Sequence, residues 1–223
     1  MNDKELVAHH AASLVEDGMV VGLGTGSTAN LFIQELARRQ REEGLNITTV
    51  ASSTVSTIKA REQGLKLVAI EHLTKLDLYV DGADEVTPDL TLLKGRGYDL
   101  VREKLLARTS DRFVVMIDRS KLVSRIGEKY PIPVEVMPFA WALVKAQLEK
   151  LGGIGDLRLN TAKDGLVITS HGSLVLDMAF DVRVDSQALD ALLNATPGVV
   201  EHGIFTGLTD TLLIAHEGAI ETK

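Results

Sequence analysis

The chain has 223 residues, of which 45% are hydrophobic and 25% charged, which are proportions typical of a compact globular protein. Its net charge of -7 disfavours binding to nucleic acid or to anionic membranes, and the absence of cysteine excludes disulfides, thiol nucleophiles and thiolate metal sites. The acidic start Met1–Glu5 has no apolar signal core, and no apolar run is long enough for a membrane span. We therefore expect a cytoplasmic protein with neither a membrane nor a nucleic-acid partner.

The first 118 residues alternate between helical and strand patterns. Apolar residues at helical spacing predict helices, and short continuous apolar runs predict buried strands. Ser27 or Thr28 is expected to cap the second helix. The expected elements are helices at 4–17, from the cap at Ser27 or Thr28 to Gly44, at 54–63 and at 98–107, and strands at 19–23, 47–51, 65–70, 76–80 and 113–118. Such alternation is typical of a parallel sheet that binds ligands at its strand ends.

The pattern changes near Tyr130–Pro133, where we place a domain boundary. The following order of two helices and four strands predicts a smaller ferredoxin-like α+β domain, inserted at 131–198 into a Rossmann-like α/β domain of 1–130 and 199–223. Its expected elements are strands at 132–136, 156–160, 165–170 and about 199–204, and helices at 138–151 and 185–194. The apolar stretch 174–180 fits this order awkwardly, and a last strand at 211–215 is expected to return to the first sheet.

A glycine-rich segment, Gly22–Thr28, follows the first expected strand and precedes a helix. Backbone N–H groups and the helix dipole favour an anion there, although an ordinary tight turn would have the same composition. A dinucleotide fingerprint would require glycine at position 27, which is serine, and an acidic residue about 20 positions later. The segment Ala51–Thr57 instead carries hydroxyl side chains, which can bind a ligand or begin a helix.

Asp81–Glu85 follows the strand at 76–80, and its carboxylates could bind a metal, orient sugar hydroxyls or move protons, or simply form a turn. Lys94–Gly97 places a lysine beside glycines, where it can stabilise a developing negative charge. By spacing alone, Glu103 and Lys121 are ordinary surface residues. The six histidines lack metal-ligand spacing, so we expect no metal.

Five segments occur in the order and spacing of type A ribose-5-phosphate isomerase, which the chain resembles over nearly its whole length. They are Gly22–Ala29, Asp81–Glu85, Lys94–Gly97, Arg102–Lys104 and Pro133–Val136. The resemblance implies an isomerase of the pentose phosphate pathway that works as a homodimer or homotetramer without metal or other cofactor. It also implies a sugar-phosphate site lined by Thr25, Gly26, Ser27, Thr28, Asp81, Gly82, Ala83, Asp84, Lys94, Gly95, Arg96, Gly97 and Lys121. Arg96 departs from the family, which usually has glycine there. Either its backbone is strained at positive φ and its guanidinium offsets the strain by contacting the substrate phosphate or an acidic neighbour such as Asp84, or its φ is ordinary and its side chain points to solvent.

The resemblance implies interconversion of ribose 5-phosphate and ribulose 5-phosphate through an enediolate. Glu103 would take the proton from carbon 2 and return it to carbon 1, and Lys94 would stabilise the negative oxygen. Asp81 and Asp84 would orient hydroxyls and help to open the ring. Two other functions stay open at this point, namely a sugar-phosphate-sensing module and a coenzyme A transferase with a glutamate nucleophile.

Overall fold

A computed structural model describes residues 2–181 and 185–223. Contacts between Cα atoms divide the chain into two compact units. The first unit comprises Met1–Ala83, Arg102–Lys121 and Leu208–Lys223, and the second comprises Asp84–Val101 and Leu122–Gly207. Residues 84–101, 122–130 and 199–207 therefore belong to the second unit, beyond the 131–198 expected from the sequence. The division into a catalytic domain of 1–130 and 199–223 and an inserted domain of 131–198 stays a prediction.

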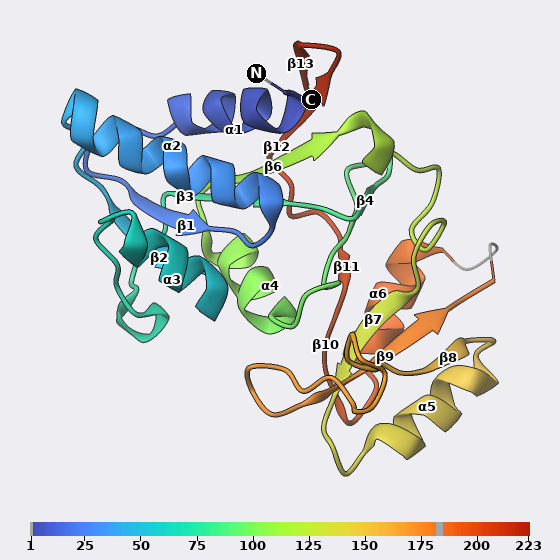
Figure 1. Ribbon diagram of the computed structural model, residues 1–223. Coiled ribbons are helices and arrows are strands. Elements are labelled where there is room, and N and C mark those ends of the chain that lie inside the picture. The colour runs from blue at the N-terminus through green and yellow to red at the C-terminus, as the bar shows by residue number, and fades with distance from the viewer. Residues whose placement is uncertain (1, 182–184) are drawn as a thin grey trace. The chain divides into compact units, whose positions relative to one another are not determined.

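Within the described residues, the first unit is built on a six-stranded sheet with the order β13-β12-β6-β3-β1-β2 (Figure 1). Its strands are β13 (Ala219–Thr222), β12 (Thr211–His216), β6 (Phe113–Asp118), β3 (Leu78–Gly82), β1 (Val20–Leu23) and β2 (Thr48–Ala51). All neighbours are parallel except β12 and β13. The predicted return of the last strand to this sheet is confirmed, because β12 pairs with β6. The antiparallel edge strand β13 was not predicted.

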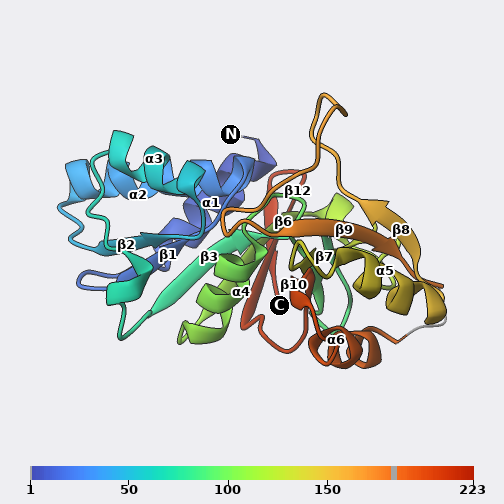
Figure 2. The same ribbon diagram turned by 90° about the horizontal axis from the view of Figure 1, so that it is seen from below.

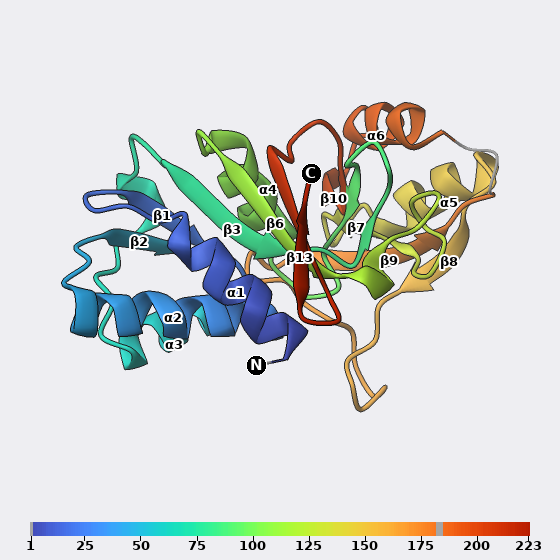
Figure 3. The same ribbon diagram turned by 90° about the horizontal axis from the view of Figure 1, so that it is seen from above.

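Helices cover both faces of this sheet, with α1 and α2 on one face and α4 on the other (Figures 2 and 3). They are α1 (Asp3–Ser13), α2 (Ser27–Glu43), α3 (Thr54–Glu62) and α4 (Leu100–Thr109), and the short 3-10 turns are η1 (Ile70–His72) and η2 (Arg119–Lys121). The expected strand at 65–70 is wrong, because only Leu67 bridges to Thr49 and the chain then turns into η1.

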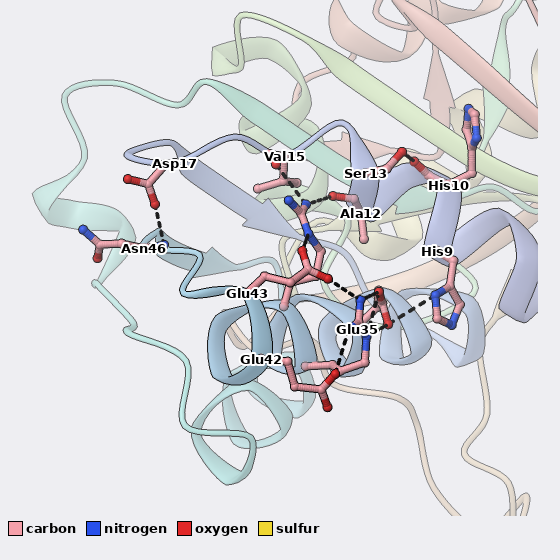
Figure 4. A network of polar contacts seen from close by, with 12 residues as sticks. His9, His10, Ala12, Ser13, Val15, Asp17, Glu35, Glu42, Glu43 and Asn46 are labelled. Carbon is pink, nitrogen blue, oxygen red and sulfur yellow. Dashed lines mark hydrogen bonds and ion pairs between the residues drawn. The ribbon is translucent and has the colours of Figure 1, made fainter.

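The packing of α1 on α2 combines an apolar interior with a polar rim. Val7 and Ala11 of α1 pack in the same buried cluster as Ile33 of α2. At the rim, His9 Nδ1 lies 3.2 Å from Glu35 Oε2, and Arg38 Nη2 donates to Glu35 Oε1 at 2.6 Å (Figure 4). The Arg38 hydrogen bond, followed by the charge of His9, lowers the pKa of Glu35 despite its burial.

The second unit contains an antiparallel sheet with the order β10-β7-β9-β8. Its elements are β7 (Ile132–Val136), α5 (Trp141–Lys150), β8 (Ile154–Leu157), β9 (Leu174–Ala179), α6 (Ser186–Asn194) and β10 (Val199–His202). In chain order the strands stand 4-1-3-2, which is the ferredoxin-like arrangement. Val144 of α5 and Leu189 of α6 share one core with Leu176 of β9, so both helices cover the same face. The predicted α/β fold class with a ferredoxin-like part is confirmed.

The third strand of this sheet differs from the one expected. The expected strand at 165–170 is wrong, since this segment makes only the isolated bridges of Leu166 to Leu159 and Ile168 to Leu174. The awkward apolar stretch supplies β9, which pairs with both β7 and β8 along its length. Its buried residues Val175, Leu176 and Met178 explain the choice, because a central strand must bury apolar side chains.

A small antiparallel sheet, β11-β5-β4, completes the second unit. Its strands are β4 (Glu85–Val86), β5 (Leu92–Leu93) and β11 (Ile204–Phe205). β4 and β5 lie within the segment from Asp84 to Gly97, which carries several predicted site residues. No described helix is long and apolar enough to cross a membrane.

Candidate active site

The parallel strands of the first unit bring several predicted site residues to one edge. Gly24–Thr28 follows β1, and Asp81 lies near the end of β3, which is the neighbour of β1. The chain passes from β1 outward to β2 and then to β3 on the other side of β1. Such a reversal of strand order opens a crevice beyond the carboxyl ends, where open α/β sheets bind ligands.

Asp81 is fully buried at this edge and holds the glycine loop in place. Its Oδ1 accepts from Thr25 N at 3.0 Å and from Gly82 N at 2.7 Å, and its Oδ2 accepts from the Tyr79 hydroxyl at 2.5 Å. A Cβ added at Gly24 would lie 2.2 Å from Asp81 Oδ1 and 2.6 Å from its Cα. Glycine is therefore required at position 24 for the close approach of these two segments.

The Thr25 side chain joins a cluster of buried hydroxyls. Thr25 Oγ1 lies 2.9 Å from Ser52 Oγ and donates to Ser53 Oγ at 2.7 Å. Ser53 also caps α3 by accepting from Ser56 N, and Ser56 Oγ donates to Gly24 O at 2.6 Å. Of the two roles considered for the hydroxyl-rich segment, the helix start is thus confirmed, and the same serines support the glycine loop.

The start of α2 presents the rest of the predicted anion loop. Gly26, at φ 120°, is the N-cap residue and makes no side-chain cap hydrogen bond, so the expected capping by Ser27 or Thr28 is wrong. Gly26 and Ser27 are exposed, Thr28 is half-buried, and Ser27 Oγ accepts from Lys4 Nζ at 3.1 Å. The N–H groups of this first turn carry the positive end of the helix dipole, which favours an anion.

Glu103 is buried in the first turn of α4, with 5% of its surface exposed. Burial, then the charge of Asp81 and then that of Glu103 raise the pKa of Tyr79 well above its usual value. Tyr79 therefore keeps the proton that it donates to Asp81, and Glu103 lies near this pair. The structure thus brings together Thr25, Asp81 and Glu103 in the first unit, and Glu103 is not the surface residue that spacing alone suggests.

Asp84 and Glu85 belong to the second unit and have different surroundings. Asp84 is half-buried, and its backbone N–H donates to Leu93 O at 2.8 Å, next to the antiparallel pairing of β4 with β5. Glu85 is fully buried and accepts from the backbone N–H groups of Gly127, Lys129 and Tyr130 at 2.6 to 2.9 Å. Glu85 therefore shapes the 127–130 loop. Gly82 and Ala83, which precede this pair in the first unit, are half-buried.

The Lys94–Gly97 loop follows β5. Lys94 is 4% exposed, its N–H donates to Gly203 O at 2.9 Å, and its Nζ lies 5.8 Å from the centre of the Phe205 ring. Gly95 has φ 94°, and a Cβ there would collide with Leu100 at 1.8 Å. Glycine at 95 is thus required both by the backbone and by the packing.

Arg96 does not have the strained backbone that was considered for it. Among the described residues other than glycine, positive φ occurs at Leu90, Lys163 and Glu217, and Arg96 has ordinary φ. Its side chain is exposed, as the alternative with ordinary φ expects, and its guanidinium also lies 4.0 Å from the centre of the Tyr130 ring. A cation above an aromatic face is stabilised electrostatically, so the substituted position has a partner of its own.

Lys121 ends η2, which follows β6 at the same edge of the first-unit sheet, and it is half-buried. Over residues 2–181 and 185–223, no group of three or more histidine, cysteine, aspartate or glutamate side chains is arranged to hold a metal ion.

Tyr79 is a site residue that the sequence interpretation missed. It precedes Asp81 by two positions on β3, and residues i and i+2 of a strand face the same side. This spacing, combined with the rule that a buried tyrosine hydroxyl needs a partner, could have identified the pair.

Comparisons with known proteins agree with this arrangement. A family described as Ribose 5-phosphate isomerase A (phosphoriboisomerase A) matches residues 48–219. Ribose-5-phosphate isomerase A of Methanothermobacter thermautotrophicus is 47% identical over 214 residues, which are 96% of this chain and 93% of that protein. The corresponding protein of Thermosynechococcus vestitus is 45% identical over 95% of this chain and 90% of its own length.

Solved structures give the same result. Ribose 5-phosphate isomerase A from Methanocaldococcus jannaschii is 41% identical with a TM-score of 0.94, covering 99% of this chain and 97% of that one. A D-ribose-5-phosphate isomerase in complex with phospho-erythronic acid is 35% identical with a TM-score of 0.96, covering 100% and 99%. The sensing-module and coenzyme A transferase functions are thereby set aside. The chain belongs to the ribose-5-phosphate isomerase A family of the pentose phosphate pathway, whose activity is the interconversion of ribose 5-phosphate and ribulose 5-phosphate.

Proposed function

We propose that Glu103 is the base that moves a proton between carbons 2 and 1 of open-chain ribose 5-phosphate. The observation that carries this proposal is the burial of the Glu103 carboxylate near the Tyr79–Asp81 pair, at the ligand-binding edge of the sheet. Removal of the proton from carbon 2 gives an enediolate, and delivery of the proton to carbon 1 gives ribulose 5-phosphate. No metal or other cofactor is needed for this transfer, since the proton and electron pair stay within the substrate and the carboxylate.

The enediolate intermediate carries a negative oxygen, and we assign its stabilisation to Lys94. Lys94 is only 4% exposed, and an ammonium stabilises a negative charge more strongly where water is excluded. Asp81 and Asp84 would orient the sugar hydroxyls and assist ring opening. Because Asp81 already accepts three hydrogen bonds from Thr25, Gly82 and Tyr79, its orientation is set before the substrate arrives.

The ligand is proposed to be a sugar phosphate. The relative bound to phospho-erythronic acid supports this, because that ligand is a phosphorylated sugar acid. The candidate groups for its phosphate and hydroxyls are the N–H groups at the start of α2, the Lys94–Gly97 loop and Lys121. With the end of β3 added, the residues proposed to line the ligand site include Thr25, Gly26, Ser27, Thr28, Gly82, Ala83, Gly95, Arg96 and Gly97.

The base is tested by Glu103→Gln, which keeps the shape of the side chain but cannot accept the proton. We expect kcat for ribose 5-phosphate to fall by about 10²-fold or more, because a positioned base contributes about 10² to 10⁴-fold, while KM changes much less. The matched control is Glu62→Gln, on an exposed helix face where the glutamate only pairs with Lys59. If Glu103→Gln keeps a third of the wild-type kcat, Glu103 is not the base.

We also propose a homodimer or homotetramer, acting in the cytoplasm. Large apolar side chains of the second unit are unusually exposed, with Phe139 at 83%, Leu143 at 78% and Ile154 at 79%. Burial of such side chains against another copy would be favourable. Light scattering of the purified protein should give two or four times the 24.1 kDa chain mass, and a monomer would contradict the assembly.

A further inference from the structure

One arginine of the second unit holds the backbone of the Lys94–Gly97 loop. Arg158 lies just after β8, and its Nη1 donates to three successive carbonyl oxygens, those of Gly95 at 2.9 Å, Arg96 at 3.3 Å and Gly97 at 2.9 Å. The other side of its guanidinium donates to Asp177 of β9, from Nε at 2.8 Å and from Nη2 at 2.5 Å. The Arg158 side chain is 12% exposed, so this arrangement is largely withdrawn from water.

The direction of these carbonyls determines the direction of the next N–H groups. The chain has no cis peptide bonds among its described residues, and in a trans peptide the C=O and the following N–H point in opposite directions. With the carbonyls of 95–97 turned toward Arg158, the N–H groups of Arg96, Gly97 and Tyr98 are turned away from it. No described residue accepts a hydrogen bond from these N–H groups, and residues 96–98 are exposed.

Both ends of the loop are also fixed. Lys94 N donates to Gly203 O at its start, and Ser170 Oγ donates to Asp99 Oδ1 at 2.5 Å at its end. Three carbonyl dipoles pointing at one spot repel one another unless a cation lies there. The planar guanidinium can donate to them while it remains in a bidentate pair with Asp177, which a lysine ammonium cannot do with the same geometry.

We propose that Arg158, held by Asp177, is a positioning residue for the isomerase reaction. It turns the N–H groups of Arg96, Gly97 and Tyr98 outward as a row of donors for an anionic oxygen of the substrate. This proposal rests on the proposed function of the Lys94–Gly97 loop. The oxygen belongs either to the substrate phosphate or to the enediolate, and both are anionic acceptors that successive backbone N–H groups bind well.

The test compares Arg158→Lys and Arg158→Met with Lys145→Met. Lys145 is the matched control, because it forms an ion pair with Asp156 of β8 in the same unit and does not contact the loop. For each purified protein, kcat and KM for ribose 5-phosphate, the inhibition constant of inorganic phosphate and the melting temperature are measured. Both Arg158 variants should lose about tenfold or more in kcat/KM relative to Lys145→Met, since losing one oxyanion donor costs about 10² to 10³-fold and here the donors are displaced rather than removed.

Which of the measured constants changes shows which substrate oxygen the N–H groups bind. A raised KM with an equally raised inhibition constant for inorganic phosphate assigns the N–H groups to the phosphate, and a lowered kcat with unchanged phosphate inhibition assigns them to the enediolate. If the role of Arg158 were purely structural, kcat, KM and the inhibition constant of inorganic phosphate would stay unchanged in the fraction that remains folded at the assay temperature.

Asp177→Asn provides a second route if Arg158→Met does not fold. Because Asp177 acts through Arg158, this variant should show the same change in constants to a smaller degree, and the double variant should be no worse than Arg158→Met alone. The proposal is wrong if Arg158→Lys and Asp177→Asn both stay within about threefold of Lys145→Met in kcat/KM. A wild-type protein that does not isomerise ribose 5-phosphate would contradict the proposed function instead.

Discussion

Removal of the Tyr79 hydroxyl tests whether the buried Tyr79–Asp81 hydrogen bond organises the site. Tyr79→Phe keeps the ring, which stacks on Phe113 at 5.0 Å between centres, and removes only the donor 2.5 Å from Asp81 Oδ2. Both residues are fully buried, so water does not replace the lost donor. A hydrogen bond to a charged group contributes about 1.5 to 3 kcal/mol, and we expect a loss of about 2 kcal/mol in the free energy of unfolding.

For a chain of this size, such a loss lowers the melting temperature by about 4 to 8 °C, which circular dichroism during heating will measure. Tyr98→Phe is the control for stability, because Tyr98 is 45% exposed and should melt like the wild type. The kcat of Tyr79→Phe should also fall, since Asp81 loses one of the groups that orient it. A melting temperature within about 1 °C of the wild type would refute the reasoning.

Three further predictions concern pH, metals and the sheet. The pKa of Glu35 is lowered by its hydrogen bond from Arg38, so the stability it contributes is present above its unfolded value of 4.5 and is lost as the pH falls through the lower folded value. Glu35→Gln should therefore melt with a weaker pH dependence than the wild type below about pH 5, and an unchanged dependence would contradict this. Activity should survive exhaustive chelation, and its loss with recovery on adding Mg²⁺, Mn²⁺ or Zn²⁺ would show that a metal takes part. Truncation after Gly207 removes β12 and β13 and should lower the melting temperature, whereas an unchanged value would show that the returning strand is dispensable.

The sequence predicted those elements whose own apolar pattern indicates that they are buried. The continuous apolar run at Phe113–Asp118 was predicted with its observed bounds, because a strand buried on both faces needs no partner to be recognised. The choice between 165–170 and 174–179 could not be made locally, since both segments suit a strand and only pairing with β7 and β8 favours the second.

The site was predictable where its chemistry follows a motif. The glycine loop and Asp81 were found from their composition and their place after strands, and the structure joins them by the hydrogen bond from Thr25 N to Asp81. The anchoring of 95–97 by Arg158 was not predictable, because the partners lie more than 60 residues apart in sequence and depend on the folded sheet. Nothing in the pattern around an isolated arginine indicates which carbonyls it will meet.

The most direct test of the central claim, proton transfer by Glu103, is isotope exchange in D2O. Wild-type protein and Glu103→Gln are incubated with ribose 5-phosphate, and NMR follows the proton at carbon 2 of the aldose and deuterium at carbon 1 of the ketose. We expect the wild type to replace the carbon-2 proton during isomerisation, and Glu103→Gln to do so at least about 10²-fold more slowly. Exchange by Glu103→Gln at the wild-type rate would contradict the assignment of Glu103 as the base.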